Sequence, residues 1–181
     1  MITNKLKTLA QINRLVSVLR KRNKKIVFTN GCFDILHYGH LKYLEEAKKN
    51  GDILIVGVNT DSSVKALKGK SRPINKCRDR IALLAGLECV DYCLAFKEKT
   101  PIKIIKVIKP DILVKGSDWK KEDIVGYKFV TAYGGKVKTI KFEKGYSTTN
   151  IIKKIIDNEK KEFTSHTGCK HKSDKGRTAC M

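Results

Sequence analysis

Two histidines, His37 and His40, lie on either side of Tyr38-Gly39, directly after a glycine-containing turn at 30–34. The apolar residues that follow recur at helical spacing: Leu41, Leu44 and Ala47. The two imidazoles therefore lie at or near the start of a helix, where unpaired N–H groups and a partial positive charge favour an anion. Gly39 places no side chain between them, so a bulky anion can approach the backbone. This spacing predicts a site for a nucleotide phosphate.

A second candidate anion site comes late in the chain, where Ser147, Thr148 and Thr149 precede a predicted helix at 151–156. Hydroxyl groups beside the free N–H groups of a helix start can bind phosphate. Taken alone, the same residues are more simply an N-cap. The phosphate-binding hypothesis gains weight because the motif follows the last predicted strand.

A basic loop at 68–74 contains Lys68, Lys70 and Arg72, which we expect to close over a substrate as a mobile loop. The loop also imitates the end of a P-loop. That motif requires glycine at position 64, where this chain has Val64. We therefore exclude a P-loop.

The histidine turn follows a short apolar run, Ile26 to Phe28, which is typical of a central parallel strand. Further strand patterns lie at 52–59, 90–96, 111–116 and 136–142, with helical patterns between them. This alternation predicts an α/β fold with a Rossmann-like, doubly wound parallel sheet of about five strands. Right-handed crossovers bring all strand carboxyl ends to one edge. We expect that edge to collect Asp34, His37, His40, Asp61, Lys115, Asp118 and Ser147 to Thr149.

The composition is strongly basic, with 39 Lys and Arg against 18 Asp and Glu and a net charge of +21 over 181 residues. A lysine-rich solvated surface explains this excess most simply, and a basic nucleic-acid-binding module is the alternative. The six cysteines form no CxxC pair, and we find neither a signal peptide nor an apolar run of membrane length. We expect a cytoplasmic chain with reduced thiols and no membrane partner.

The stretch from Gly31-Cys32-Phe33-Asp34 into His37-Tyr38-Gly39-His40 resembles the signature of the HxGH nucleotidyltransferases. Four further stretches narrow this resemblance to the D-glycero-D-manno-heptose 1-phosphate adenylyltransferases, the nucleotidyltransferase half of ADP-heptose synthase. They are Gly57 to Asp61, Lys68 to Pro73, Lys115 to Trp119 and Gly145 to Asn150.

The chain also departs from its neighbouring families. Glycerol-3-phosphate cytidylyltransferases share several of these motifs, but they usually carry a basic residue where this chain has Phe142 and Glu143. The heptose group usually has glycine at Ser117 and a small residue at Tyr146. If Tyr146 points into the pocket, it alters the fit of the substrate or the nucleotide.

The resemblance implies an adenylyltransferase that moves AMP from ATP to D-glycero-D-manno-heptose 1-phosphate, for lipopolysaccharide synthesis. The attacking phosphate oxygen is already ionised at neutral pH, so the reaction needs positioning and charge neutralisation and no general base. The alternatives are a cytidylyltransferase acting on glycerol 3-phosphate or a similar small phosphate, and the nucleic-acid-binding module.

The predicted site has three groups of residues. The candidate catalytic residues are His37, His40 and Lys115. The candidate nucleotide-binding residues are Asn30, Gly31, Cys32, Phe33, Gly39, His40, Lys42, Arg80, Gly116, Asp118, Ser147, Thr148 and Thr149. The candidate substrate-binding residues are Asp34, Asp61, Lys68, Lys70 and Arg72.

Mg²⁺ is the expected cofactor, held through the phosphates of ATP rather than mainly by protein side chains. A protein-held transition metal is the rival hypothesis, because Asp34, His37 and His40 recur at every third residue. Two purely structural histidines are the remaining alternative.

We expect an N-terminal amphipathic helix within 1–24, packed on the nucleotidyltransferase domain at 25–159, and a basic, disordered tail at 160–181. The tail's histidines and cysteines fit no common zinc spacing. The resemblance further implies a homodimer. The chain is too short for the sugar-kinase half, so we expect a separate kinase to supply the sugar 1-phosphate.

Overall fold

The computed structural model describes residues 4–117 and 120–167, with side chains described up to residue 160. The chain divides into two compact units, Met1–Thr148 and Thr149–Met181. The first unit carries the sheet, and the second contains nearly all of helix α7, Thr148–Thr167. This helix is much longer than the predicted one at 151–156 and continues past the predicted start of the tail. The sequence at 159–162 is Glu-Lys-Lys-Glu, and these residues are good helix formers, which favours continuation of the helix.

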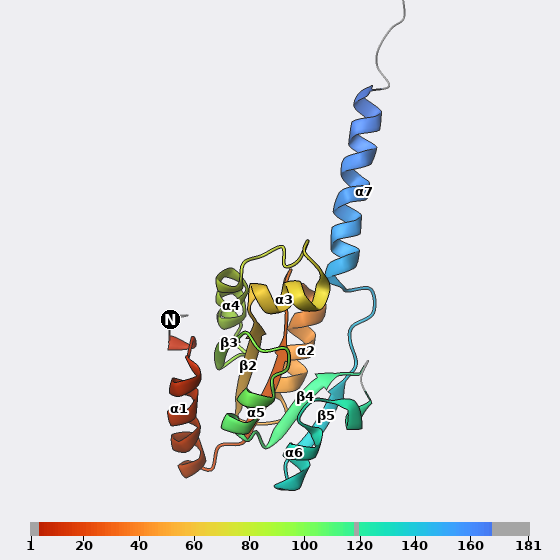
Figure 1. The fold of residues 1–181 in the computed structure, drawn as a ribbon. Coiled ribbons are helices and arrows are strands. Elements are labelled where there is room, and N and C mark those ends of the chain that lie inside the picture. Colours follow the sequence, from red (N-terminus) through yellow and green to blue (C-terminus); the bar gives the residue numbers. More distant parts are fainter. Residues whose placement is uncertain (1–3, 118–119, 168–181) are drawn as a thin grey trace, which may run out of the picture. The chain divides into compact units, whose positions relative to one another are not determined.

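The sheet of the first unit has five parallel strands in the order β3-β2-β1-β4-β5. The strands are β1 Ile26–Gly31, β2 Ile53–Asn59, β3 Tyr92–Phe96, β4 Ile112–Gly116 and β5 Lys136–Ile140. The remaining helices are α1 Leu9–Lys21, α2 Tyr38–Lys48, α3 Asp61–Lys68, α4 Cys77–Gly86, α5 Ile102–Ile108, the 3₁₀ turn η2 Lys121–Asp123 and α6 Tyr127–Ala132. The prediction of a doubly wound, five-stranded parallel sheet is confirmed (Figure 1).

The strand order reverses between β1 and β4. From β1 the chain builds β2 and β3 on one side, and then it returns to place β4 and β5 on the other. In sheets of this kind, ligands bind outside the carboxyl ends of the strands at the point of reversal. Here β1 ends on Asn30-Gly31 and β4 ends on Lys115-Gly116.

Apolar side chains cover both faces of the sheet, because successive residues of a strand point to opposite sides. On one face, Phe28 and Ile55 pack with helices α1, α5 and α6. On the other, Val27 and Leu54 pack with α2 and α4. Burial on both faces explains why the strands are continuous apolar runs.

The N-terminal segment protects the sheet edge. The backbone of residues 5–7 pairs with β3, where Lys7 N–H donates to the Cys93 carbonyl at 2.9 Å and Cys93 N–H donates to the Lys5 carbonyl at 2.8 Å. Helix α1 then begins at a capping box made by Thr8 and Gln11. This edge pairing was not visible in the sequence. It leaves β3 without a bare edge along this segment. In the described part of the chain, no helix is long and apolar enough to cross a bilayer.

We predict that Gly51→Ala destabilises the first unit by about 1–3 kcal/mol, the usual cost of an overpacked site. An added Cβ would lie 2.7 Å from the Lys25 carbonyl oxygen and 2.8 Å from a Val27 methyl group, and the carbonyl is backbone and cannot swing aside. Gly86→Ala is the matched control, because an added Cβ there meets nothing within 4 Å. Urea unfolding measures both variants. Equal midpoints for Gly51→Ala and the parent chain would contradict the packing argument.

Candidate active site

His37 is the N-cap of α2, as the spacing predicted. Its backbone is extended, and its Nδ1 accepts a hydrogen bond from the His40 N–H at 3.3 Å. An Nδ1 that accepts carries no proton, so the neutral ring holds its proton on Nε2. The cap therefore selects the tautomer and leaves Nε2–H as a donor at the positive end of a helix.

The two imidazoles are stacked, with ring centroids 3.7 Å apart and planes 16° apart. Phe33 meets the His40 ring edge-on at 5.2 Å. Phe33 is buried and has a left-handed φ of 46°. An added Cβ on Gly31 would lie 3.1 Å from the Phe33 ring, so the turn depends on glycine there. The strained turn between β1 and α2 thus places an aromatic ring against His40.

Both histidines are neutral at neutral pH. Burial, then the charges of His37 and Lys68, lowers the pKa of His40 from 6.5 to about 4. Burial also lowers the pKa of His37. Two stacked rings cannot both ionise cheaply. The pair therefore acts as neutral donors until an anion changes the local charge.

A cavity of about 160 Å³ lies at the point of strand reversal. Its walls are Asn30, Gly31, Cys32, Phe33, Asp34, His40, Tyr43, Lys68, Lys115, Gly116, Phe142 and Thr148. The Lys115 ammonium donates to the Asn30 carbonyl at 3.2 Å, so β4 and β1 are linked at its floor. Within the described part of the chain, Asn30 Oδ1 and His40 Nδ1 are buried without a hydrogen-bond partner. Unpaired buried polar atoms in a cavity indicate a site for a polar ligand.

A larger cavity of about 450 Å³ adjoins the first. The two share Asn30, Gly31, Cys32, Lys68 and Lys115. The larger one is completed by Asn59, Leu67, Lys99, Thr100, Pro101, Ile124 and Val125. Two connected compartments, with lysines between them, can hold two substrates that meet at their phosphates.

Asp34 has different partners from those we predicted. It is 2% exposed. One oxygen accepts from Arg72 Nε at 2.6 Å, and the other accepts from the backbone N–H groups of Ile74 at 2.7 Å and Asn75 at 3.0 Å. Both oxygens of Asp34 are engaged with protein groups, which argues against a substrate contact for this carboxylate. Arg72 donates to it through Nε, and the substrate contact of Arg72 stays a prediction.

Arg80 is likewise engaged inside the protein. It is 1% exposed and donates to the Cys32 carbonyl at 2.5 Å, the Asn75 carbonyl at 2.9 Å and Asp61 Oδ1 at 2.7 Å. The guanidinium joins the Cys32 turn, Asn75 and Asp61 through these three bonds. This engagement argues against its predicted phosphate contact. Asp61 keeps 40% of its side chain exposed.

Other predicted residues lie around these cavities. Lys42 pairs with Glu45 at 2.9 Å on α2, and Lys70 is exposed in the basic loop. Neither lines the two cavities. Thr148 lines the smaller cavity, and Ser147 directly precedes it in the chain. Thr149 is the first residue of the second unit. Asp118 lies outside the described residues.

Tyr146 lies at the rim rather than in a cavity. Its ring centroid is 6.4 Å from His37 and 5.2 Å from Tyr38, and 47% of the residue is exposed. An added Cβ on Gly39 would lie 2.9 Å from the Tyr146 Cβ. Gly39 therefore makes room for the segment that carries Tyr146, in addition to any ligand.

The sequence reasoning missed Tyr43 and Asn75. Tyr43 lines the smaller cavity and shares a 2.7 Å hydrogen bond with the buried Thr29 hydroxyl. It comes three residues after His40, so helical spacing alone could have placed it on the same face. Asn75 carried no signal, because its role depends on Asp34, which lies 41 residues away in the sequence.

The rival hypothesis of a protein-held metal is not supported by these residues. Among the described residues, no group of three or more His, Cys, Asp or Glu side chains is arranged to hold an ion. Asp34, which the metal hypothesis groups with the two histidines, accepts hydrogen bonds from protein donors at both carboxylate oxygens.

A doubly wound parallel sheet, with stacked histidines at a helix start and lysines at the strand reversal, defines a nucleotide-binding enzyme of the α/β class. The chain belongs to the cytidylyltransferase-like family, whose profile matches residues 28–154. This match confirms the predicted fold class and the nucleotidyltransferase class of enzyme.

Two curated relatives carry the name Bifunctional protein HldE. The protein from Aliarcobacter butzleri (strain RM4018) is 56% identical over 155 residues, which cover 86% of this chain and 32% of that protein. The protein from Histophilus somni (strain 129Pt) is 58% identical over 146 residues, which cover 81% of this chain and 31% of that protein. The chain thus spans about a third of these relatives.

Solved structures agree with the fold. The lipopolysaccharide core biosynthesis protein from Thermoplasma volcanium GSS1 is 36% identical with a TM-score of 0.56, and the match covers 68% of this chain and 99% of that one. Pantoate-beta-alanine ligase from Francisella tularensis, at 19% identity and a TM-score of 0.56, covers 77% of this chain and 67% of that one, and shares the fold. The family match and the HldE proteins confirm the resemblance predicted from the motifs.

We predict that acidification destabilises the protein through His40. Its pKa is about 4 in the folded chain and 6.5 without burial, so the unfolded state takes up the proton first. The stabilising contribution is complete above the higher value and is lost as the pH falls toward the lower one. Urea midpoints across this range, compared with those of His40→Asn, measure the effect. An NMR titration in which His40 shows an ordinary pKa would contradict this prediction.

Proposed function

We propose that this chain transfers AMP from ATP to D-glycero-D-manno-heptose 1-phosphate, producing ADP-heptose and pyrophosphate. The observation that carries the proposal is the stacked His37–His40 pair at the start of α2, beside the cavity that also contains Lys115. The motif resemblance supports the choice of sugar and nucleotide, and so does the high identity to the HldE proteins.

In this proposal the nucleotide phosphates bind at the α2 N-terminus. His37 Nε2–H and the His40 ring donate to oxygens of the α-phosphate, where charge develops in the transition state. Lys115 supplies a positive charge at the end of β4. Because the nucleophile is an ionised phosphate, the histidines move no proton from it; they bind and orient. Arriving negative charge raises the imidazole pKa values and strengthens these hydrogen bonds.

The remaining phosphates lie against Thr148 and its neighbours Ser147 and Thr149 in this proposal. Backbone groups at Asn30 to Phe33, Gly39 and Gly116 line the approach. Lys42 is a peripheral charge. Asp118 belongs to the same set by resemblance alone.

We assign the acceptor sugar phosphate to the larger cavity. Lys68 borders both cavities and can hold a phosphate at their junction. Lys70 follows on the same loop, and the exposed Asp61 oxygen is available to a sugar hydroxyl. Mg²⁺ bound to the ATP phosphates would neutralise part of their charge, and the phosphates would supply most of its ligands.

We further propose a cytoplasmic homodimer that receives its sugar 1-phosphate from a sugar kinase. The relatives are named bifunctional, and the present chain matches about a third of their length. A second activity in the remainder of those proteins is consistent with a kinase acting first.

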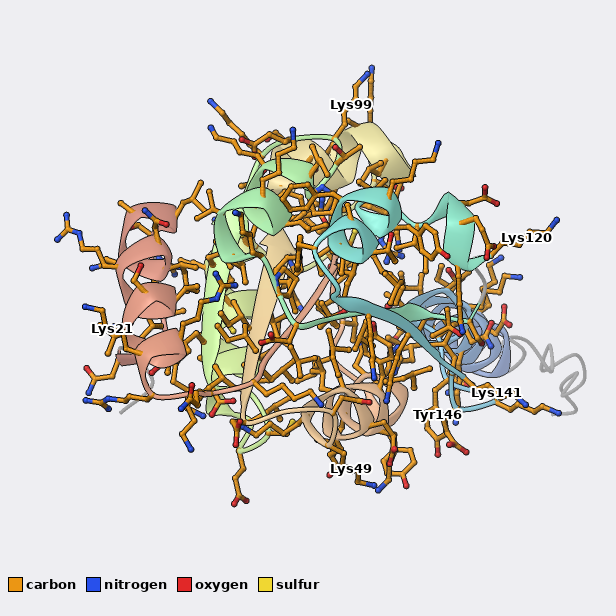
Figure 2. All side chains as sticks on the ribbon, turned by 90° about the horizontal axis from the view of Figure 1, so that it is seen from below. Lys21, Lys49, Lys99, Lys120, Lys141 and Tyr146 are labelled. Atoms are coloured by element: carbon orange, nitrogen blue, oxygen red, sulfur yellow. The ribbon has the colours of Figure 1, made fainter. Side chains whose placement is uncertain are left out.

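The basic composition does not favour the nucleic-acid alternative. The exposed lysines labelled in Figure 2 project from different sides of the first unit: Lys21, Lys49, Lys99, Lys120 and Lys141. A duplex or single strand needs positive charge gathered on one face or groove. Dispersed charge fits a solvated surface.

We predict that His37→Ala and His40→Ala each reduce turnover at least ~10²-fold, which is the scale of losing a transition-state donor. The release of pyrophosphate from ATP and heptose 1-phosphate measures the rate. Circular dichroism and urea midpoints report whether the fold is intact. Lys49→Ala, on the exposed end of α2, is the control and should keep parental turnover. Near-parental rates in either histidine variant would sink the assignment.

We predict that pyrophosphate release requires ATP with heptose 1-phosphate. The assay crosses ATP and CTP with heptose 1-phosphate and glycerol 3-phosphate, using the parent chain. Release confined to CTP with glycerol 3-phosphate would replace our proposal with the cytidylyltransferase alternative.

A further inference from the structure

We infer that Asp34 is a positioning residue that anchors the basic loop at 68–74 over the active site. It would then act through Arg72 and the backbone of Asn75 rather than by touching substrate. Only the identity of the loop's ligand rests on the proposed function.

The anchor itself is buried and fully paired. The Asp34 side chain is 1% exposed and the Arg72 side chain 13% exposed, with 2.6 Å between Nε and Oδ2. The other oxygen binds two consecutive backbone N–H groups, at Ile74 and Asn75. Charge-assisted bonds to a buried carboxylate are strong, so three of them hold residues 72–75 in one place.

Asn75 ties this anchor to the second buried charge. Its backbone N–H donates to the Asp34 carboxylate, its side-chain amide donates to the Asp34 carbonyl at 3.0 Å, and its own carbonyl accepts from Arg80 at 2.9 Å. Arg80 also holds the Cys32 carbonyl. Asp34 and Arg80 therefore clamp one residue from two sides, and both are linked to the turn that leads into His37.

The segment just before the anchor has the opposite character. Residues 65–71, which are the last turn of α3 and the start of the basic loop, are exposed without interruption and include Lys65, Lys68 and Lys70. Gly69 has a left-handed φ of 95° and open space around it. Few contacts restrain the exposed residues that follow the end of α3 at Lys68, so their path depends on the point where the loop is held.

Two facts connect the anchor to the reaction. Lys68 lines both cavities, only four residues before Arg72. Asp34 precedes the N-cap His37 by three residues. A carboxylate at this position sets the distance between the lysine loop and the histidines. Replacing Asp34 should therefore release Lys68 without removing any group that contacts a phosphate.

Limited trypsin digestion without ligand tests the anchor directly. We expect Asp34→Asn and Arg72→Met to speed cleavage after Lys68 and Lys70 at least about tenfold, because each loses the charge-assisted bond that restrains the loop. The double variant should cleave no faster than Asp34→Asn alone, since that change already removes the charge-assisted bond to Arg72. Arg72→Met leaves Asp34 its two backbone bonds, so it reports on the loop even if Asp34→Asn folds poorly. Asp79→Asn is the control, because Asp79 pairs with Arg78 on the surface.

Kinetics separate positioning from substrate contact. We expect Asp34→Asn and Arg72→Met to have matching effects: the fold-change in KM should be the same in both variants, and so should the fold-change in kcat, because both changes displace the same loop. Unchanged cleavage after Lys68 and Lys70 in both single variants would overturn the inference. Asp34→Asn with parental cleavage and a raised KM for the sugar phosphate alone would make Asp34 a substrate ligand instead.

The parent chain is the reference for function: if it releases no pyrophosphate, the proposed function fails, while the digestion result still decides the anchor.

Discussion

The reversal of strand order between β1 and β4 is the constraint on which the rest of the structure depends. Neighbouring strands that lead to helices on opposite faces leave a crevice at their carboxyl ends. This chain ends those two strands on Asn30-Gly31 and Lys115-Gly116, small or polar residues that keep the crevice open. The buried apolar runs that form the sheet thus also determine where a ligand can bind. The bond between Lys115 and the Asn30 carbonyl closes the floor of that crevice.

The histidine turn converts this crevice into a chemical site. An N-cap side chain accepts a hydrogen bond from a free backbone N–H at the start of a helix. Here the acceptor is Nδ1 of the His37 imidazole, and this bond fixes the tautomer of the ring. Burial lowers the pKa of His40 and keeps its ring uncharged at neutral pH. In the proposed function, this neutral ring becomes a stronger donor when negatively charged phosphates bind beside it. The small Gly39 then lets the Tyr146 segment pack against this turn. The same residues, His37, Gly39 and His40, therefore serve both the packing of the turn and the proposed chemistry.

Two charged residues that the sequence predicts as ligands, Asp34 and Arg80, are bonded to protein groups in the structure. Asp34 and Arg80 are almost completely buried, and each satisfies three protein groups. A buried charge is tolerated only when it is paired and hydrogen-bonded. Their pairing connects the basic loop, the histidine turn and the start of α3. The exposed lysines labelled in Figure 2 project from different sides of the first unit instead.

The sequence by itself determined the strands, the parallel sheet and the helix start at His37, because these follow from local apolar patterns, glycines and spacing. It also indicated Lys68, Lys115 and Thr148, which lie at element ends and line the cavity. Only the tertiary structure decided how the buried charges pair. Arg72 is 38 residues from Asp34, and Cys32 is 48 residues from Arg80, and no local pattern reports which distant group will satisfy a charge. The sequence shows an Asp or an Arg in the same way whether its charge binds a substrate or a group of the protein. Burial and hydrogen-bond partners, which only the structure gives, distinguish the two roles.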